Sequence, residues 1–332
     1  MRTLLALLAA VSGLLAGPRA RWVDERGGIH DEPIAEVLSE SPAAVKVRLV
    51  GGDEVEIACR GLVDLVREDE EDPEQRELYL ARLAVWAGEA GEGIRRTLDR
   101  YASRKGWMGE YASATRAFLA ARENEEGCGE RVAAFEKAYP GSRFLNEMEF
   151  ARAHLESHAG DDMDTFINPF LGSWERIEAR GGPALLQWRG MLAGTMIVKR
   201  KDLIPIKMFL GTFASRVKET AITKEDALLT VIGESALRWA ELLIVQDWHA
   251  YMREPTYRPI VARATLQRCI DGSTLLLPDV RSDLECELAL VVEACGDHAA
   301  AVEGMRRAAE LAPDPRRRAR IAAELKRMEA TG

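Results

Sequence analysis

The chain has 332 residues, of which 47% are hydrophobic and 30% are charged, a balance typical of folded soluble proteins rather than of disordered or membrane proteins. The formal net charge is -9, and no sustained basic stripe runs through the sequence, which argues against a nucleic-acid-binding surface. The only basic cluster, Arg316-Arg317-Arg318-Ala319-Arg320, is interpreted as the solvated face of a final helix.

The N-terminal stretch has the pattern of a secretory signal peptide. Arg2 precedes a continuous apolar run from Leu4 to Ala16, and small residues follow it. The run is shorter than the ~20 apolar residues that a transmembrane helix needs. We therefore predict a cleavable signal at residues 1–20 and a protein exported to the periplasm or the extracellular space. Cleavage after Ala16, after Gly17 or after Ala20 fits the pattern.

Residues 21–67 predict a small β module, either barrel-like or a sheet. Apolar and polar residues alternate over 33–38, 44–50 and 54–58, which is the pattern of half-buried strands. Gly51-Gly52-Asp53 predicts a hairpin turn between the second and third of these, and residues 63–66 are a candidate fourth strand.

Residues 68–76 carry an acidic run that predicts a solvated linker or the acidic opening of the next helix. Six of the seven residues from Glu68 to Glu74 are carboxylates, and the seventh is Pro73. A calcium loop is the functional alternative, but its alternating acidic spacing around a central glycine is missing.

From residue 77 to the end, at 332, the pattern is helical almost without interruption. Apolar residues recur at helical spacing, and glycine- or proline-containing breaks divide the helices into short neighbouring pairs. The stretch 183–217 is the most apolar and predicts a helix buried at the centre of the array. The predicted segments are 78–90, 94–103, 111–122, 130–139, 144–158, 163–179, 183–217, 225–252, 258–270, 284–315 as two short helices, and 316–329.

The clearest pair lies at residues 284–315 and breaks at Cys295-Gly296-Asp297. Leu288, Ala289 and Val292 form an apolar stripe on its first helix, and Ala301, Met305 and Ala308 form one on its second. Gly296 ends the first helix and Asp297 can cap the second. A turn this short makes the two helices antiparallel, and alanine at their crossing allows a close approach.

This stretch resembles a tetratricopeptide repeat, as found in exported bacterial repeat proteins. The residues that carry the resemblance are Leu288, Ala289, Val292, Gly296, Asp297, Ala301, Ala308 and Pro313. Glu285 and Met305 depart from it, because the family prefers tryptophan and an aromatic residue there. The resemblance implies a mainly α-helical α-solenoid that binds protein or peptide partners on its concave side.

His154 and His158 are the candidate metal ligands. A spacing of four residues on a helix brings both rings to one face, close enough to share a zinc ion. Leu155, however, occupies the position at which metalloproteases carry their glutamate. We interpret the two histidines as surface or capping residues, and a metal-dependent hydrolase is the alternative.

Four tryptophans of the central helices are the candidate ligand-binding residues: Trp174, Trp188, Trp239 and Trp248. They can line a groove for a peptide or glycan, but tryptophans at helical spacing also fill gaps between helices. The sequence has no nucleophile elbow and no glycine-rich phosphate loop, so no catalytic residue, metal or cofactor is predicted.

The five cysteines fit a disulfide framework poorly. Their number is odd, and nine residues of one helix separate Cys286 from Cys295, about 13 Å along the axis. A bond from Cys269 to either of them stays open, and small buried thiols are the alternative.

Together these patterns predict an exported, non-enzymatic scaffold that binds a protein or peptide through a helical repeat surface. The β module at 21–67 precedes the linker at 68–76 and the helical domain at 77–332. The alternatives are a metal-dependent hydrolase using His154 and His158, and a structural envelope component that assembles with itself.

Overall fold

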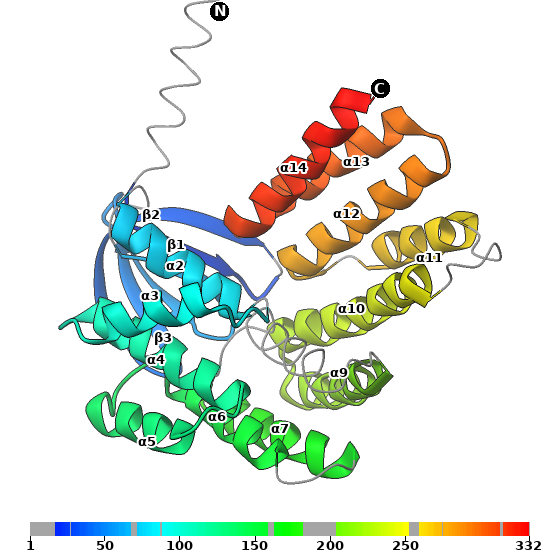
Figure 1. Cartoon of the computed structure of the whole chain (residues 1–332). Coiled ribbons are helices and arrows are strands. Elements are labelled where there is room, and N and C mark those ends of the chain that lie inside the picture. The colour runs from blue at the N-terminus through cyan, green and yellow to red at the C-terminus, as the bar shows by residue number, and fades with distance from the viewer. Residues whose placement is uncertain are drawn as a thin grey trace, which may run out of the picture. The chain divides into compact units, whose positions relative to one another are not determined.

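The computed structural model describes residues 17–26, 28–67, 72–86, 88–158, 163–181, 204–251, 259–273, 275–312 and 315–331 (Figure 1). The chain divides into two compact units. Unit 1 comprises Met1–Trp22 and His30–Thr195, and unit 2 comprises Val23–Ile29 and Met196–Gly332. Twelve helices and one small sheet make up the described residues, so the protein is mainly α-helical.

The β module is an open five-stranded antiparallel sheet in the order β4-β3-β2-β1-β5. The sheet alternative of the sequence analysis is therefore right and the barrel alternative is wrong, because the edge strands β4 and β5 do not pair with each other. The first strand was not predicted. The strands are β1 (Arg19–Val23), β2 (Ile29–Glu40), β3 (Ala44–Leu49), β4 (Glu54–Ala58) and β5 (Leu62–Val66).

Strand alternation separates an apolar face of the sheet from a charged one. Val45, Val47 and Ile57 are buried in one cluster. Lys46 and Arg48, between and beyond them on β3, point to the other face, since successive side chains of a strand alternate. The predicted hairpin turn lies between β3 and β4, and its Gly52 has a φ of +95°, which favours glycine.

Six helices complete the described part of unit 1, and their positions confirm the predicted segments to within a few residues. The first begins directly after Asp72, whose side chain accepts hydrogen bonds from the Glu74 and Gln75 amides at 2.8 and 3.2 Å. Residues 73–76 of the predicted linker thus belong to a helix. The helices are α2 (Pro73–Trp86), α3 (Glu92–Ala102), α4 (Trp107–Arg122), α5 (Cys128–Ala138), α6 (Leu145–Ser157) and α7 (Met163–Glu178).

Polar contacts join the sheet to these helices inside unit 1. Asn146 donates a side-chain hydrogen bond to the Pro42 carbonyl at 2.9 Å. The carboxylate of Glu40 at the end of β2 forms ion pairs with Arg67 and, at 3.2 Å, with Arg143. The small sheet therefore does not have to supply all of its own stability.

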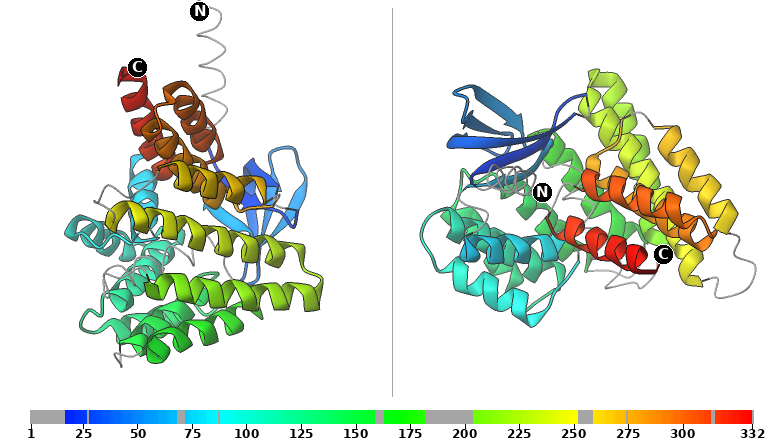
Figure 2. Two further views of the ribbon diagram at one scale, coloured as in Figure 1. Left: turned by 90° about the vertical axis from the view of Figure 1, so that its right-hand side faces the viewer. Right: turned by 90° about the horizontal axis from the view of Figure 1, so that it is seen from above.

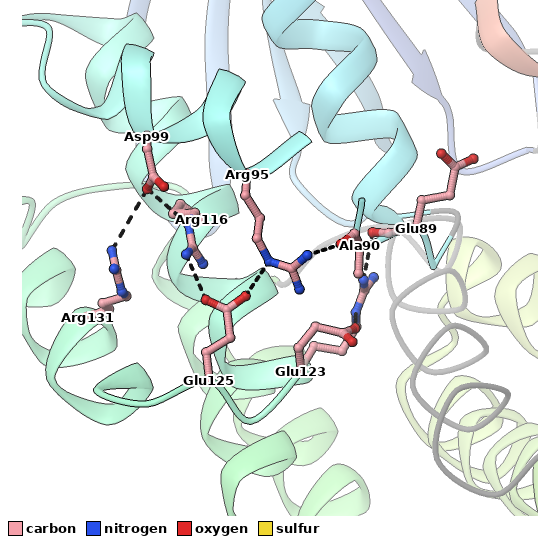
Figure 3. A network of polar contacts seen from close by, with 9 residues as sticks. Glu89, Ala90, Arg95, Asp99, Arg116, Glu123, Glu125 and Arg131 are labelled. Atoms are coloured by element: carbon pink, nitrogen blue, oxygen red, sulfur yellow. Dashed lines mark hydrogen bonds and ion pairs between the residues drawn. The ribbon is translucent and has the colours of Figure 1, made fainter. Parts of the chain in front are cut away.

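A network of ion pairs joins α3, α4 and the start of α5 (Figure 3). The carboxylate of Glu125 accepts from Arg95 and from Arg116, each at 2.7 Å, and Arg116 also bonds Asp99 at 3.0 Å. The Arg122 guanidinium, 2% exposed, bonds the Glu89 carbonyl at 2.8 Å. The network thereby also holds the loop between α2 and α3.

We expect the Glu125 carboxylate to make stability depend on pH. Burial works to raise its pKa, but hydrogen bonds from Arg95 and Arg116 outweigh burial and lower the pKa below its usual value. The stabilisation is therefore complete above the unfolded pKa of about 4.3 and is lost as pH falls through the lower folded pKa. Glu125→Gln should lower the free energy of unfolding at pH 6 by about 1–2 kcal/mol.

Urea unfolding of both proteins at pH 6 and pH 3 measures this effect. The difference in unfolding free energy between wild type and Glu125→Gln should shrink at pH 3, where the wild-type carboxyl gains its proton. A difference in unfolding free energy that stays constant or grows at pH 3 would contradict the assignment of the lowered pKa to Glu125.

From residue 204 onward, the described part of unit 2 consists of helices and the short segments that join them. The sequence predicted a break between two helices within residues 217–225, and the structure has it at residues 225–226. Glu225 has a positive φ of 52° there, and the Asp226 side chain accepts a hydrogen bond from the Leu229 amide at 3.1 Å. Most of the predicted apolar helix 183–217 lies outside the described residues. The helices are α9 (Ile204–Lys224), α10 (Ala227–Tyr251), α11 (Pro259–Asp271), α12 (Pro278–Ala294), α13 (His298–Leu311) and α14 (Pro315–Thr331).

The predicted helical pair at 284–315 is confirmed as the hairpin α12–α13. Gly296 has a φ of +87° in the turn, and the Asp297 side chain accepts from the Ala300 amide at 3.2 Å. A Cβ added to Gly304 would lie 3.2 Å from the Ala289 Cβ, so small residues do set the closeness of this crossing. Helices α12, α13 and α14, orange to red, run side by side in both views of Figure 2.

No helix among the described residues is long and apolar enough to span a membrane.

Candidate functional site

The candidate site is a hollow in unit 1 beside the edge strand β5, which we call the β5 hollow. It occupies about 350 Å³, a volume that includes open solvent. The residues that line it are apolar (Leu65, Val66, Leu78), aromatic (Tyr79, Trp107, Tyr111) and polar (Arg67, Gln75, Arg76).

Three elements bring these residues together: the end of β5, the first turns of α2 and the first turns of α4. Trp107 and Tyr111 are four residues apart, so their rings share one face of α4, where they meet edge to face at 6.1 Å between centroids. Gly109 is required here, because a Cβ at that position would lie 1.9 Å from the Arg104 carbonyl oxygen. A glycine thus lets the preceding loop lie against α4 next to Trp107.

The two arginines of the hollow differ in their partners. Arg67 is half-buried and ion-paired with Glu40. Burial, and secondarily the nearby Arg143, lowers the pKa of Arg67 to about 10, so it stays charged at neutral pH. Arg76 is exposed, and its guanidinium forms no ion pair with any residue the structure describes. The mouth of the hollow therefore offers one solvated cation.

Behind the hollow lies a buried arginine surrounded by aromatic rings. The Arg82 guanidinium sits 4.4 Å from the Trp86 ring centroid, 4.9 Å from that of Tyr111 and 4.8 Å from that of Phe144. We call Arg82 with these three rings the arginine cage. Tyr111 belongs both to the cage and to the hollow, so the cage fixes one wall of the hollow.

Two polar groups complete the cage. Arg82 donates to the Thr115 hydroxyl at 2.8 Å and to the carboxylate of Glu147, which it also neutralises as an ion pair. The side chains of Arg82 and Glu147 are only 4% and 5% exposed. Such a buried pair is costly to break, because removal of one partner leaves the other charge without compensation.

The β5 hollow has the chemistry of recognition. Apolar and aromatic side chains make up most of its lining, and Arg76 adds one solvated cation. Its lining contains neither a serine or cysteine nucleophile nor a carboxylate or histidine that could serve as a general base. It can take up an apolar group and donate hydrogen bonds to an acceptor beside that group.

The predicted metal ligands lie elsewhere in unit 1, on α6 and at its end. The interpretation of His154 as a surface residue is wrong, because His154 is 0% exposed. Its ring meets Phe118 and Phe170 edge to face at 5.3 and 4.8 Å between centroids. His158 is the residue that follows the last turn of α6. In the part of the chain that the structure describes, no group of three or more potential metal ligands contains them.

The two predicted tryptophans whose side chains the structure describes do not line the hollow. Trp174 on α7 and Trp239 on α10 are 6% and 8% exposed, which is the packing alternative of the sequence analysis. Trp188 lies outside the described residues, and so does the side chain of Trp248. Trp107 was not among the predicted binding residues, although its spacing of four from Tyr111 was a usable signal.

All five cysteines fall within the described residues, and each is a free thiol in the structure. Cys269 is buried and donates to the Glu241 carboxylate at 2.8 Å. Burial, followed by that hydrogen bond, raises its pKa to about 12. Burial likewise raises the pKa of Cys59 and of Cys286 to about 11, so these three thiols are poor nucleophiles at neutral pH.

In comparisons with known proteins, no family model, curated protein or solved structure matches this chain.

Proposed function

We propose that the protein is an exported, non-catalytic scaffold that binds a partner protein or peptide, and that the β5 hollow receives one apolar side chain of that partner. The lining of the hollow supports this proposal: apolar and aromatic groups surround it, and no catalytic set is among them. Aromatic walls of this kind anchor single side chains at protein interfaces.

The size of the hollow favours a side chain over a small molecule. Pockets for small molecules bury most of the ligand surface, whereas the roughly 350 Å³ of this hollow includes open solvent. A leucine- or methionine-sized group can enter from the solvent while its backbone stays outside. Arg76 at the mouth can then donate to a carbonyl or carboxylate of the same peptide.

A repeat architecture and an exported location belong to the same proposal. The α12–α13 hairpin, with its glycine turn, aspartate cap and small residues at the crossing, supports a helical array of the tetratricopeptide kind. The apolar run from Leu4 to Ala16 after Arg2 supports export through a cleaved signal. The hydrolase and self-assembly alternatives have no comparable support among the described residues.

Selection of displayed random peptides on the full chain tests the proposal. We expect the enriched peptides to share one large apolar residue, and Trp107→Ala to weaken their binding at least about tenfold. Arg76→Ala should weaken it about two- to fivefold, because the arginine is solvated. Arg96→Ala, which removes an exposed arginine of α3, is the matched control and should leave binding unchanged.

Each protein's melting temperature is compared first, because Trp107 also contacts Tyr111. If Trp107→Ala proves unstable, Trp107→Phe keeps the aromatic contact and should still reduce affinity. Peptides that bind both Trp107 variants as tightly as the wild type, or a selection that enriches nothing, would overturn the proposal.

A further inference from the structure

The second edge of the sheet, β4, is open to the solvent, whereas β5 is covered. Leu65 and Val66 of β5 are 3% and 9% exposed and line the hollow together with residues of α2. On β4, Glu54, Glu56 and Ala58 are exposed, and so are residues 51–53 of the preceding turn. Among the described residues, the order of the sheet gives β4 one neighbour, β3, so one row of its backbone amides and carbonyls faces no other described strand.

The side chains of β4 define two different faces for an added strand. Val55 packs against the buried cluster of the sheet and Ile57 belongs to it. Glu54 and Glu56 point to the opposite face, since side chains alternate along a strand. A strand that pairs with β4 would therefore extend an apolar face on one side and meet carboxylates on the other.

The charged face next to this edge has an excess of carboxylates. The Lys46 ammonium lies 2.6 Å from Glu54, and Arg48 bridges Glu54 at 3.0 Å and Glu36 at 2.7 Å. Glu56 stands opposite Lys46 in the register, but the ammonium is engaged with Glu54. No ion pair joins Glu56 to a residue that the structure describes, so its carboxylate is available at the edge.

These carboxylates favour pairing with a basic partner strand over pairing with β4 of a second copy of the chain. Antiparallel pairing of β4 with β4 of a second copy, centred on Val55 or on Glu56, would set Glu56 against a glutamate, and like charges directly opposite destabilise a pair. A strand with lysine or arginine opposite Glu56 removes that repulsion. Its intervening apolar side chains would lie beside Val55 and Ile57.

We propose that β4 is a docking edge for an extended partner segment that alternates basic and apolar residues, added to the sheet by backbone hydrogen bonds. The surface is separate from the β5 hollow. Backbone pairing supplies the affinity, and the Glu56 carboxylate selects for the basic residue. The two surfaces are independent, so failure of either leaves the other open to its own test.

Amide NMR titration of the full chain with an eight-residue peptide of alternating lysine and valine tests the inference. We expect shifts centred on residues 54–58 and a loss of affinity of about fivefold in Glu56→Lys. A peptide with glutamate in place of lysine should bind Glu56→Lys more tightly than it binds the wild type. Glu156→Lys, an equal charge change on the exposed face of α6, is the control and should bind as the wild type does.

A second measurement separates strand addition from simple charge attraction. Methylation of those peptide nitrogens that face β4 should abolish binding, whereas methylation at the alternate positions should have little effect. Binding that tolerates methylation at every position, or that ignores the Glu56→Lys reversal, would overturn the proposal. Absence of any binding would also overturn it, and the edge carboxylates would then serve only to prevent pairing.

Discussion

Replacement of the caged arginine, Arg82→Ala, should lower the free energy of unfolding by about 3–5 kcal/mol. The substitution leaves the Glu147 carboxylate, whose side chain is 5% exposed, without its counterion. It also opens a cavity among Trp86, Tyr111 and Phe144, whose rings now lie within 5 Å of the guanidinium. Urea unfolding at neutral pH, with the midpoint compared at constant slope, measures the change.

A second pair of variants separates the loss of charge from the loss of packing. Arg82→Met fills most of the cage but leaves the buried Glu147 carboxylate without a counterion. Its free energy of unfolding should therefore remain clearly below that of the wild type. The double variant Arg82→Met with Glu147→Leu removes both charges and should recover most of the loss, because replacement of a whole buried pair is often close to neutral. A loss below about 1 kcal/mol in Arg82→Ala would mean that the carboxylate reaches solvent or another partner.

The cage could not be predicted from the sequence, and the reason is physical. A charged residue on an amphipathic helix is expected on the solvated face, and Arg82 is adjacent to the buried Ala81 in the pattern of α2. Its burial depends on Glu147, which lies 65 residues away, and on Phe144 at the start of α6. Local periodicity carries no information about such a distant counterion.

What the sequence did predict depends on short-range signals. The α12–α13 turn follows from Gly296 and Asp297, and the β3–β4 hairpin follows from Gly51-Gly52-Asp53. In both cases the residues that decide the geometry are adjacent in the chain. Whether the β module is an open sheet or a closed barrel depends on whether its two edge strands pair with each other. The alternation of apolar and polar residues within each strand does not determine this.

The β5 hollow was missed for a related reason. It combines Leu65 and Val66 of a strand with Tyr79 of one helix and Trp107 of another, so no single segment contains its pattern. The tryptophans that did attract interpretation, Trp174 and Trp239, lie in apolar helices, and apolar surroundings are what bury an aromatic ring. Trp107 stands instead at the first position of α4, where one side of the helix remains open.

Removal of residues 1–20 should destabilise unit 1 by about 2–4 kcal/mol relative to removal of residues 1–17. The difference is the first part of β1, where Arg19 and Ala20 pair with Val66 and Leu65 of β5. Ala20 is 0% exposed, and Arg19 donates to the Asp31 carboxylate at 2.8 Å and to the Asp31 carbonyl at 2.7 Å. A chain that begins at Arg21 loses these bonds and leaves Leu65 without its neighbour in the ladder.

The contacts of Arg19 and Ala20 favour two of the three signal-cleavage sites that fit the sequence. Cleavage after Ala16 or Gly17 keeps β1 whole, whereas cleavage after Ala20 removes two of its five residues. We therefore expect the intact mass of the exported protein to correspond to a start at Gly17 or Pro18. Urea unfolding of the 18–332 and 21–332 forms measures the stability difference. Equal stability of the two forms would contradict the role given to Arg19 and Ala20, and a mature start at Arg21 would show that export proceeds at the cost of this strand.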